Sequence, residues 1–213
     1  MLTVHHLGVS QSDRIVWLCE ELAIPYRLVR HEREPVTRLA PASYRSLHPA
    51  GTAPVIVDGE VVLAESGAIV DYLLARHEGG QLIVGADNAH FADYLYWLHF
   101  ANGSFMPAMM LELAVRILAP DDITPATRAL VARSQHAFQM VEARLAEVPY
   151  FAGPSFSIAD IMMHFPLTTM RLFVPRDVSH LPNMLAYLER IAARPGWQRA
   201  MAKAEPGFKP VLD

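Results

Sequence analysis

The sequence has little cysteine and no long apolar run, and each shortage excludes a class of protein. One cysteine, Cys19, cannot form an internal disulfide, so we expect a reducing compartment, the cytoplasm. No apolar run approaches the roughly 18 residues of a membrane helix. The first residues, MLTVHHLGVS, lack the basic start and long apolar core of a signal peptide. We therefore predict a cytoplasmic protein that has no membrane partner.

Positive charge is scarce as well. The only lysines are Lys203 and Lys209, and 22 acidic against 18 basic residues give a net charge of −4. This balance does not provide the broad positive field that nucleic acid binding requires, so we expect no nucleic-acid partner. Hydrophobic residues, in contrast, make up 52% of the chain, which is enough for a buried core.

The first third of the chain has the pattern of a small α/β domain. Its predicted elements are, in order, a strand over 2–7, a helix over 12–22, a strand over 24–29, a short helix near 43–47, a hairpin over 54–64 and a helix over 66–77. The strand–helix–strand unit implies a parallel pair with a right-handed crossover. Asp58-Gly59 is the predicted two-residue turn of the hairpin.

The pattern changes after residue 78. Residues 79–87 have the composition of a linker, and beyond them the chain predicts helices only. These helices lie near 88–117, 124–147, 157–172, 182–194 and 195–204. The predicted domains are therefore an α/β domain over 1–78, a linker over 79–87 and an all-helical domain over 88–213. Pro107 should kink the first long helix or end its first half.

Both longer helices of the α/β domain begin at polar residues directly after a strand. Ser10 to Ser12 precede the first helix, and Glu65-Ser66 open the last. A helix N-terminus carries unpaired N–H groups and a partial positive charge, so each is a candidate anion site. Taken alone, Ser12 and Ser66 are ordinary N-caps, and Pro54 is an ordinary strand-edge proline.

The combination of these features resembles a known family. The stretches that carry the resemblance are HHLGVSQSDRIVWLCEEL, LHPAGTAPVIVDGEVVLAESGAIVDYL and FAGPSFSIADIMM, in that order. They are similar to the cytosolic glutathione transferases, most of all to the bacterial and fungal branches with serine in the first loop. The resemblance implies a thioredoxin-like domain followed by a helical bundle, and glutathione as co-substrate with no other cofactor.

The resemblance also implies how glutathione is held. It makes the bond before Pro54 cis and lets the backbone of Ala53 pair with the cysteinyl part, as an added strand would. Glu65 and Ser66 would hold the γ-glutamyl end, the Ser66 hydroxyl taking its carboxylate. Gln11, beside the predicted catalytic serine, is placed in the same glutathione site.

One stretch departs from the family pattern. The family often has Asn-Pro-x-Gly-Lys before the cis proline, and the lysine helps to bind the glycyl carboxylate. This chain has His48-Pro49-Ala50-Gly51-Thr52 instead. The glycyl end must therefore use His48, Thr52, the backbone or an arginine.

Ser10 falls at the position of the family's catalytic serine, although an N-cap role alone is the alternative. A free thiol has a pKa of about 8.5, and lowering it by about two units takes roughly 2.7 kcal/mol. One hydroxyl hydrogen bond to the thiolate, together with the helix N-terminus, is of that order. No nucleophilic protein residue is needed.

The spacing of cysteine and histidine in the sequence disfavours a cysteine mechanism and a metal site. Cys19 lies on the apolar stripe with Ile15 and Leu22, which is typical of a buried, inert cysteine. The ten histidines show no tight ligand spacing, and His5 and His6 point to opposite faces of a strand. We therefore predict no metal site.

The helical domain offers a candidate electrophile pocket in the second half of the helix predicted near 88–117. Its residues are Asn102, Phe105, Met106 and Met109. A Met and aromatic stripe is most often core, whereas the resemblance places it at the electrophile pocket and the dimer contact. Ser157 and Asp160 form a predicted N-cap box, whose role is folding.

Three functions remain open from the sequence. The first is a homodimeric glutathione transferase that adds the thiolate to hydrophobic electrophiles. The second is a glutathione-dependent peroxidase or disulfide reductase on the same site. The third is a non-catalytic binding or regulatory module, which Thr52 favours and which the set Ser10, Pro54, Glu65 and Ser66 opposes.

Overall fold

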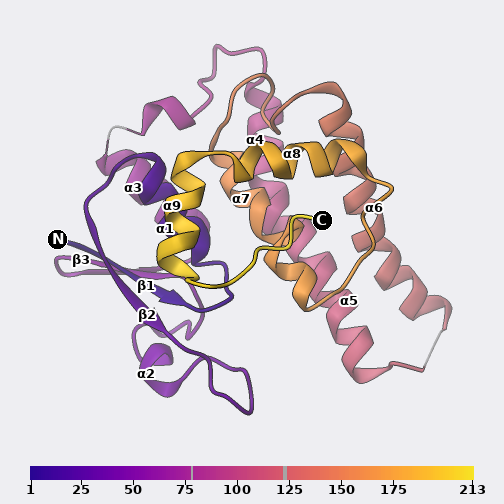
Figure 1. Ribbon diagram of the computed structural model, residues 1–213, viewed down its shortest axis with the longest axis horizontal. Coiled ribbons are helices and arrows are strands. Elements are labelled where there is room, and N and C mark those ends of the chain that lie inside the picture. Colours follow the sequence, from indigo (N-terminus) through magenta and orange to yellow (C-terminus); the bar gives the residue numbers. More distant parts are fainter. Residues whose placement is uncertain (78, 122–123) are drawn as a thin grey trace. The chain divides into compact units, whose positions relative to one another are not determined.

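The computed structural model describes residues 1–77, 79–121 and 124–213 (Figure 1). The chain divides into two compact units, Met1–Gln81 with Ala192–Lys209, and Leu82–Ile191 with Pro210–Asp213. Glu78, the last residue of the predicted first domain, lies outside the described residues. The sequence-based division assigned residues 192–209 to the helical domain, whereas the contacts group them with the first unit.

The first unit contains a four-stranded sheet in the order β2-β1-β3-β4. Its strands are β1 (Leu2–Leu7), β2 (Tyr26–His31), β3 (Val55–Asp58) and β4 (Val61–Ala64). β1 pairs with β2 in parallel and with β3 antiparallel, so that Val4 lies beside both Leu28 and Ile56. Its helices are α1 (Asp13–Glu21), α2 (Ala42–Arg45), α3 (Ser66–Arg76), the short η1 (Gly80–Leu82) and α9 (Pro195–Ala204). This is the thioredoxin-like arrangement that the resemblance implied.

The hairpin between β3 and β4 is confirmed, but its turn is shifted by one residue. Asp58 pairs with Val61, so the two turn residues are Gly59 and Glu60 rather than Asp58 and Gly59. Gly59 has φ 63°, a left-handed conformation that glycine adopts without steric cost. The position that requires glycine therefore comes first in the turn.

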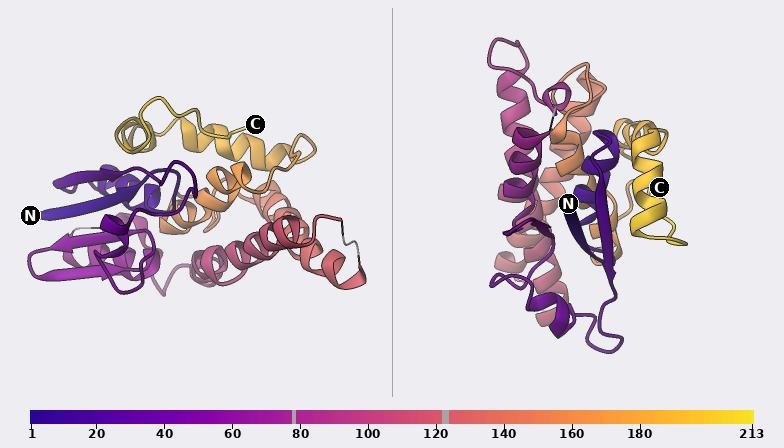
Figure 2. Two further views of the ribbon diagram at one scale, coloured as in Figure 1. Left: turned by 90° about the horizontal axis from the view of Figure 1, so that it is seen from below. Right: turned by 90° about the vertical axis from the view of Figure 1, so that its left-hand side faces the viewer.

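Helix α9 packs along α1, as Figures 1 and 2 show. The apolar stripe of α1 covers only one face of the helix, yet nearly every residue of α1 is buried. The packing of α9 on another face accounts for this. The outer face is held by ion pairs, with Glu21 bound by Arg194 and Glu20 bound by Arg199 and Lys203. The approach is close, because a Cβ at Gly196 would lie 2.6 Å from the Glu21 carboxyl carbon.

The second unit is helical. Its elements are α4 (Phe91–Phe100), the π-helical η2 (Ala101–Phe105), α5 (Met106–Leu118), α6 (Pro125–Glu147), α7 (Ile158–Leu167), the 3-10 helix η3 (Thr169–Leu172) and α8 (Pro182–Ala192), which ends one residue inside the other unit. α5 packs along α6, and α4 along α7. In the part of the chain that the structure describes, no helix has the length and apolar character needed to cross a bilayer.

The long helix predicted near 88–117 is divided close to Pro107, as expected. Residues Ala101–Phe105 adopt a π-helix between α4 and α5, and Pro107 lies in the first turn of α5. Proline has no N–H and its ring displaces the carbonyl one turn earlier, so the regular α-helical pattern cannot pass through this point. A π-helical turn widens the helix there.

The predicted N-cap box at α7 is confirmed. Asp160 Oδ2 accepts a hydrogen bond from Ser157 N at 2.8 Å, and Asp160 Oδ1 accepts one from Phe151 N at 3.0 Å. Asp160 is fully buried, and burial raises its pKa to about 6 although these bonds act in the opposite direction. The carboxyl thus ties the start of α7 to the preceding loop.

Candidate functional site

The first loop, residues 8–12, joins β1 to α1 and carries the predicted catalytic serine. Ser10 is 6% exposed, and its hydroxyl donates to Leu7 O at 2.7 Å. Ser10 Oγ also lies 2.7 Å from Ser12 Oγ. The predicted N-cap, Ser12, does occupy that position, yet its side chain makes no capping bond to α1. Its hydroxyl is used elsewhere.

Ser12 is bonded to a buried histidine of β1. Ser12 Oγ lies 2.8 Å from His6 Nδ1, and His6 Nε2 lies 3.0 Å from Glu205 Oε1. Ser12 and His6 are both fully buried. Glu205 follows α9 directly, so the C-terminal part of the first unit contributes a carboxylate beneath the first loop.

Val9 holds a backbone conformation that a β-branched residue rarely adopts. Its φ is 53°, in the left-handed region. Two charged side chains bind its peptide groups. Val9 N donates to Glu205 Oε1 at 2.5 Å, and the Arg33 guanidinium donates to Gly8 O at 2.8 Å and to Val9 O at 2.9 Å. Backbone strain of this kind persists only where the surroundings over-determine it, and it gathers at functional sites.

A second helix start is connected to the first through Arg14. Arg14 Nη1 donates to Gln11 Oε1 at 2.5 Å and lies 3.5 Å from Ser66 Oγ. Arg14 is fully buried, and burial lowers its pKa to about 10 while the neighbouring Asp13 opposes the shift. The guanidinium therefore stays a cation at neutral pH and keeps a positive charge between the starts of α1 and α3.

The N-cap of α3 is Glu65 rather than Ser66. Glu65 occupies the N-cap position, with φ 70° and an exposed side chain, and Ser66 is the first helical residue. The N-cap alternative for Ser66 is therefore wrong. Ser66 is 3% exposed, so its side chain is buried at the start of the helix.

The loop before β3 contains the remaining predicted glutathione residues. The peptide bond between Ala53 and Pro54 is cis, as the resemblance implied. Ala53 is half-buried and Thr52 is exposed. His48 Nδ1 accepts a hydrogen bond from Ala50 N at 3.1 Å, which orients the ring within its own turn.

Cys19 does not take part in the site. It lies in the middle of α1 with no exposed surface, and burial raises the pKa of its thiol to about 12. At neutral pH it is therefore a protonated core side chain. The prediction of an inert cysteine is confirmed.

Comparisons with known proteins decide the family. The models of the glutathione S-transferase N-terminal domain and C-terminal domain match residues 5–81 and 105–195. Glutathione S-transferase 3 of Schizosaccharomyces pombe is 31% identical, over 96% of this chain and 88% of its own length. The chain belongs to the glutathione S-transferase family. Glutathione is the co-substrate of this family, which needs no other cofactor.

Two further comparisons bear on structure and on chemistry. A crystal structure of a glutathione S-transferase from Actinobacillus pleuropneumoniae has a TM-score of 0.87 and 32% identity, covering 96% of this chain and 93% of that one. The disulfide-bond oxidoreductase YfcG of Escherichia coli is 28% identical and covers 97% of each chain. The fold predicted for this chain is thus confirmed. The named relatives include both a transferase and a disulfide-bond oxidoreductase.

The predicted electrophile residues of the helical unit are mostly core residues. Phe105 and Met109 have no exposed surface, Met106 is buried, and Asn102 is half-buried. The Phe105 ring packs against Phe100 and Phe138 within the same unit. For Phe105 and Met109 the structure therefore shows the core alternative, and their role beside an electrophile stays a prediction.

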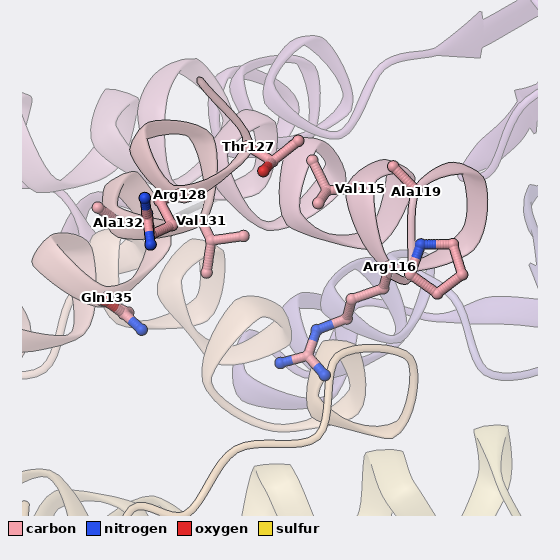
Figure 3. Close-up of a pocket in the computed structure, with 9 residues that line it drawn as sticks. Val115, Arg116, Ala119, Thr127, Arg128, Val131, Ala132 and Gln135 are labelled. Carbon is pink, nitrogen blue, oxygen red and sulfur yellow. The ribbon is translucent and has the colours of Figure 1, made fainter. Parts of the chain in front are cut away.

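A separate hollow of about 530 Å³ lies between α5 and α6 (Figure 3). Its lining residues are Val115, Arg116, Ala119, Pro120, Thr127, Arg128, Val131, Ala132 and Gln135. None of them belongs to the predicted electrophile set. Among these described lining residues the ionisable groups are the two arginines, which are neither acids nor nucleophiles at neutral pH.

Sequence reasoning missed four residues at the first loop, namely His6, Arg14, Arg33 and Glu205. Arg14 could have been found, because a buried arginine beside two candidate anion sites has a chemical reason to be there. His6 and Glu205 are 199 positions apart, and no local pattern connects them. Among the described residues there is no group of three or more His, Cys, Asp or Glu side chains that could hold a metal ion.

Proposed function

We propose that this family member is a glutathione transferase that uses Ser10 to stabilise the glutathione thiolate. The first unit would bind the tripeptide, and the thiolate would add to a hydrophobic electrophile. The thiolate forms the new bond to the electrophilic carbon, and the leaving group departs with the electron pair of the broken bond. Ser10 contributes by donating a hydrogen bond to sulfur before and during the attack.

The observation that carries this proposal is the joining of two helix starts by one buried cation. Arg14 lies between Gln11 of the first loop and Ser66 of α3. Helix N-termini and a guanidinium attract anionic groups, and the γ-glutamyl carboxylate and the thiolate are both anions. Ser10 and Ser66 therefore belong to one anion-binding region at the ends of β1 and β4.

The remaining contacts of the tripeptide follow from the loop before β3. The backbone of Ala53, next to the cis Pro54, is available for strand-like pairing with the cysteinyl part. Glu65 is exposed and can meet the γ-glutamyl amine, and Gln11 is proposed as a further glutathione contact. His48 and Thr52 are proposed to hold the glycyl carboxylate in place of the family's lysine.

The helical unit and the assembly complete the proposal. Asn102 and Met106 are the predicted pocket residues that are less than fully buried, so they are proposed to contact the electrophile. Exposed apolar residues of α4, Leu95 and Tyr96, are available for a homodimer contact. We place the protein in the cytoplasm, where glutathione keeps a lone thiol such as Cys19 reduced.

A second candidate function is a glutathione-dependent disulfide reductase or peroxidase. It is favoured by the 28% identity to a protein named disulfide-bond oxidoreductase. The buried Cys19 cannot supply a mixed disulfide, so bound glutathione itself would attack the disulfide or peroxide. The same Ser10-assisted thiolate serves both reactions.

Retention on immobilised glutathione, followed by two assays, tests these alternatives. A transferase conjugates an aryl halide faster than it reduces 2-hydroxyethyl disulfide or a hydroperoxide, and a reductase shows the reverse order. Binding without either activity identifies a non-catalytic module. Absence of glutathione binding by calorimetry contradicts the proposal altogether. Ser155→Ala, an exposed serine of the helical unit, is the matched control for serine variants.

A further inference from the structure

A continuous chain of hydrogen bonds runs from Ser10 into the interior of the first unit. It passes from Ser10 Oγ to Ser12 Oγ at 2.7 Å and from Ser12 Oγ to His6 Nδ1 at 2.8 Å. It ends between His6 Nε2 and Glu205 Oε1 at 3.0 Å. Every link is shorter than 3.2 Å, the usual limit for a good hydrogen bond. His6 and Ser12 have no exposed surface, and the Glu205 side chain is 11% exposed.

The positions of the hydrogens give this chain a direction. The carboxylate of Glu205 only accepts, so it places a hydrogen on His6 Nε2. In the neutral ring Nδ1 then accepts the hydroxyl hydrogen of Ser12. Ser12 Oγ can in turn accept from Ser10 and from Leu7 N, which lies at 3.1 Å. In this state the Ser12 hydrogen points inward, toward His6, and the single Ser10 hydrogen has two acceptors at 2.7 Å, Ser12 Oγ and Leu7 O. The relay uses the arrangement in which Ser10 donates to Ser12.

We propose that His6, held by Glu205, receives the proton of the glutathione thiol through Ser10 and Ser12. This inference rests on the proposed function and extends it, because it names the group that takes the proton. Ser10 alone touches the reacting sulfur. Ser12, His6 and Glu205 act through it and are positioning residues.

The step balances without any further reactant. The S–H bond breaks and its proton moves to Ser10 Oγ, while the Ser10 hydroxyl proton moves to Ser12 Oγ and the Ser12 proton to His6 Nδ1. The bond electrons stay on sulfur, so nothing is oxidised or reduced. Afterwards all the hydrogens point outward, and Ser10 donates to the thiolate while the imidazolium pairs with the Glu205 carboxylate. The reversed chain is thus the arrangement that stabilises the product.

Charged and titratable groups from several elements surround His6. Glu205 bonds to it directly, and Asp13 of α1 faces it, as its influence on the pKa of Asp13 shows. His31 of β2 is close as well, because His6 adds to the effect of burial in lowering the pKa of His31. Arg33 lies near Glu205 and binds the carbonyls of the first loop. Two carboxyl groups therefore face the ring on the side of α1 and α9.

Simple support of the loop does not account for this arrangement. Arg33 and Glu205 already hold Gly8 and Val9 through their peptide groups. A serine at the N-cap ordinarily bonds to its own helix, yet Ser12 directs its hydroxyl to His6 instead. A buried polar chain of fully paired hydroxyls and an imidazole is the form that proton transfer requires.

The test compares the thiolate absorbance of the glutathione complex across pH in wild type and in His6→Asn. The amide of asparagine can bond to Ser12 but cannot take up a proton. We expect the apparent pKa of the bound thiol to rise by roughly two units, toward the free value of about 8.5. We expect kcat/KM at neutral pH to fall on the order of ten- to a hundredfold and to recover at high pH, with KM for glutathione unchanged. His5→Asn, one residue earlier on the same strand, is the matched control and should match wild type.

A second variant keeps the test decisive if His6→Asn does not fold. Glu205→Gln retains an oxygen for Val9 N and removes only the charge that holds the imidazolium. It should shift the thiol titration in the same direction by about one unit, and the double variant should be no worse than His6→Asn alone. Superimposable titrations of wild type and both variants would overturn the relay and leave Ser10 as the sole aid. A wild-type complex without thiolate would instead contradict the proposed function itself.

Discussion

Two helix starts in this molecule are built from the same residue types and do different work. α1 begins Ser12-Asp13 and α7 begins Ser157 with Asp160 three residues later, and all four side chains are buried. At α7 the carboxyl binds peptide groups of Ser157 and Phe151, so the polar atoms stay within local structure. At α1 the serine hydroxyl leaves its helix and bonds to His6 on β1.

The difference separates a local helix cap at α7 from the start of α1, to which the proposed function assigns a part in the chemistry. In α7 the hydrogen bonds are local and satisfy the helix itself, which is what a cap does. In α1 the bonds lead away from the helix, through hydroxyls whose hydrogens can reverse direction. Changes at α7 should therefore affect stability, and changes at α1 should affect rate.

The largest effect is expected from Asp160→Ala, which removes the cap of α7. It leaves two buried N–H groups, of Phe151 and Ser157, without their acceptor, at a cost of about 3 kcal/mol of unfolding free energy. Thermal unfolding should show a lower Tm, and the remaining folded protein should keep its glutathione turnover. Asp87→Ala, at an exposed site, is the control. An unchanged Tm with lost turnover would reverse the contrast between the two helix starts.

Ser10→Ala tests the loop at the start of α1, and the second-largest effect is expected there. Loss of one hydrogen bond to the thiolate costs about 1.5–3 kcal/mol, which is roughly one to two units in the pKa of the bound thiol. Turnover near neutral pH should fall, and part of it should return at higher pH, while glutathione affinity changes little. Ultraviolet titration of the binary complex measures the thiolate, with Ser155→Ala beside it. Identical curves for wild type and Ser10→Ala would remove Ser10 from the mechanism.

Burial raises the pKa of both aspartates, Asp13 and Asp160, so each makes the stability of the fold depend on pH. Burial raises the pKa of Asp13 from 3.8 to about 6. The folded protein then holds a proton that the unfolded chain releases, so this contribution to stability is present below about pH 4 and lost as pH rises through 6. Compared with wild type, Asp13→Asn should lose less stability over that window, by on the order of 2 kcal/mol. Parallel curves of unfolding free energy against pH would show that Asp13 does not carry the shift.

Ser66→Ala extends the comparison to the third helix start, that of α3. Ser66 is buried beside Arg14, where the proposal places the γ-glutamyl carboxylate. A hydrogen bond to a charged group contributes about 1.5 kcal/mol or more, so the dissociation constant of glutathione should rise about tenfold. Calorimetric titration at constant pH measures it, and unchanged affinity would assign Ser66 to packing.

The smallest effect on rate is expected from Cys19→Ala, in the middle of α1. The thiol is buried and protonated at neutral pH, so it is not a nucleophile. Turnover per folded molecule should stay within a factor of about two, while the small cavity lowers stability by about 1 kcal/mol. A large loss of turnover in folded protein would restore a cysteine mechanism and move the chemistry away from the start of the helix.

Most of the fold could be predicted because its signals are local. The periodicity of apolar residues placed β1, α1, the β3–β4 hairpin and α6 to within about two residues of their bounds. The hairpin turn was misplaced by one residue because Asp58 and Gly59 are both favoured in turns, and strand pairing decides between registers. The N-cap alternative for Ser66 was wrong because Ser66 is already the first helical residue, and Glu65 is the non-helical residue before it.

The sequence by itself determined the order of the elements and the family motifs, and it singled out Ser10, Pro54 and Ser66 as candidates for the site. These depend on neighbours within a few positions, which spacing and turn chemistry record. Only the tertiary structure decided that α9 covers α1 and that Glu205 lies beside His6, 199 positions away. Packing of distant segments selects such partners, because a buried imidazole and a buried carboxylate are tolerated only where each satisfies the other. The hydrogen-bond chain from Ser10 to Glu205, and with it the proposed proton path, is therefore a property of the folded chain.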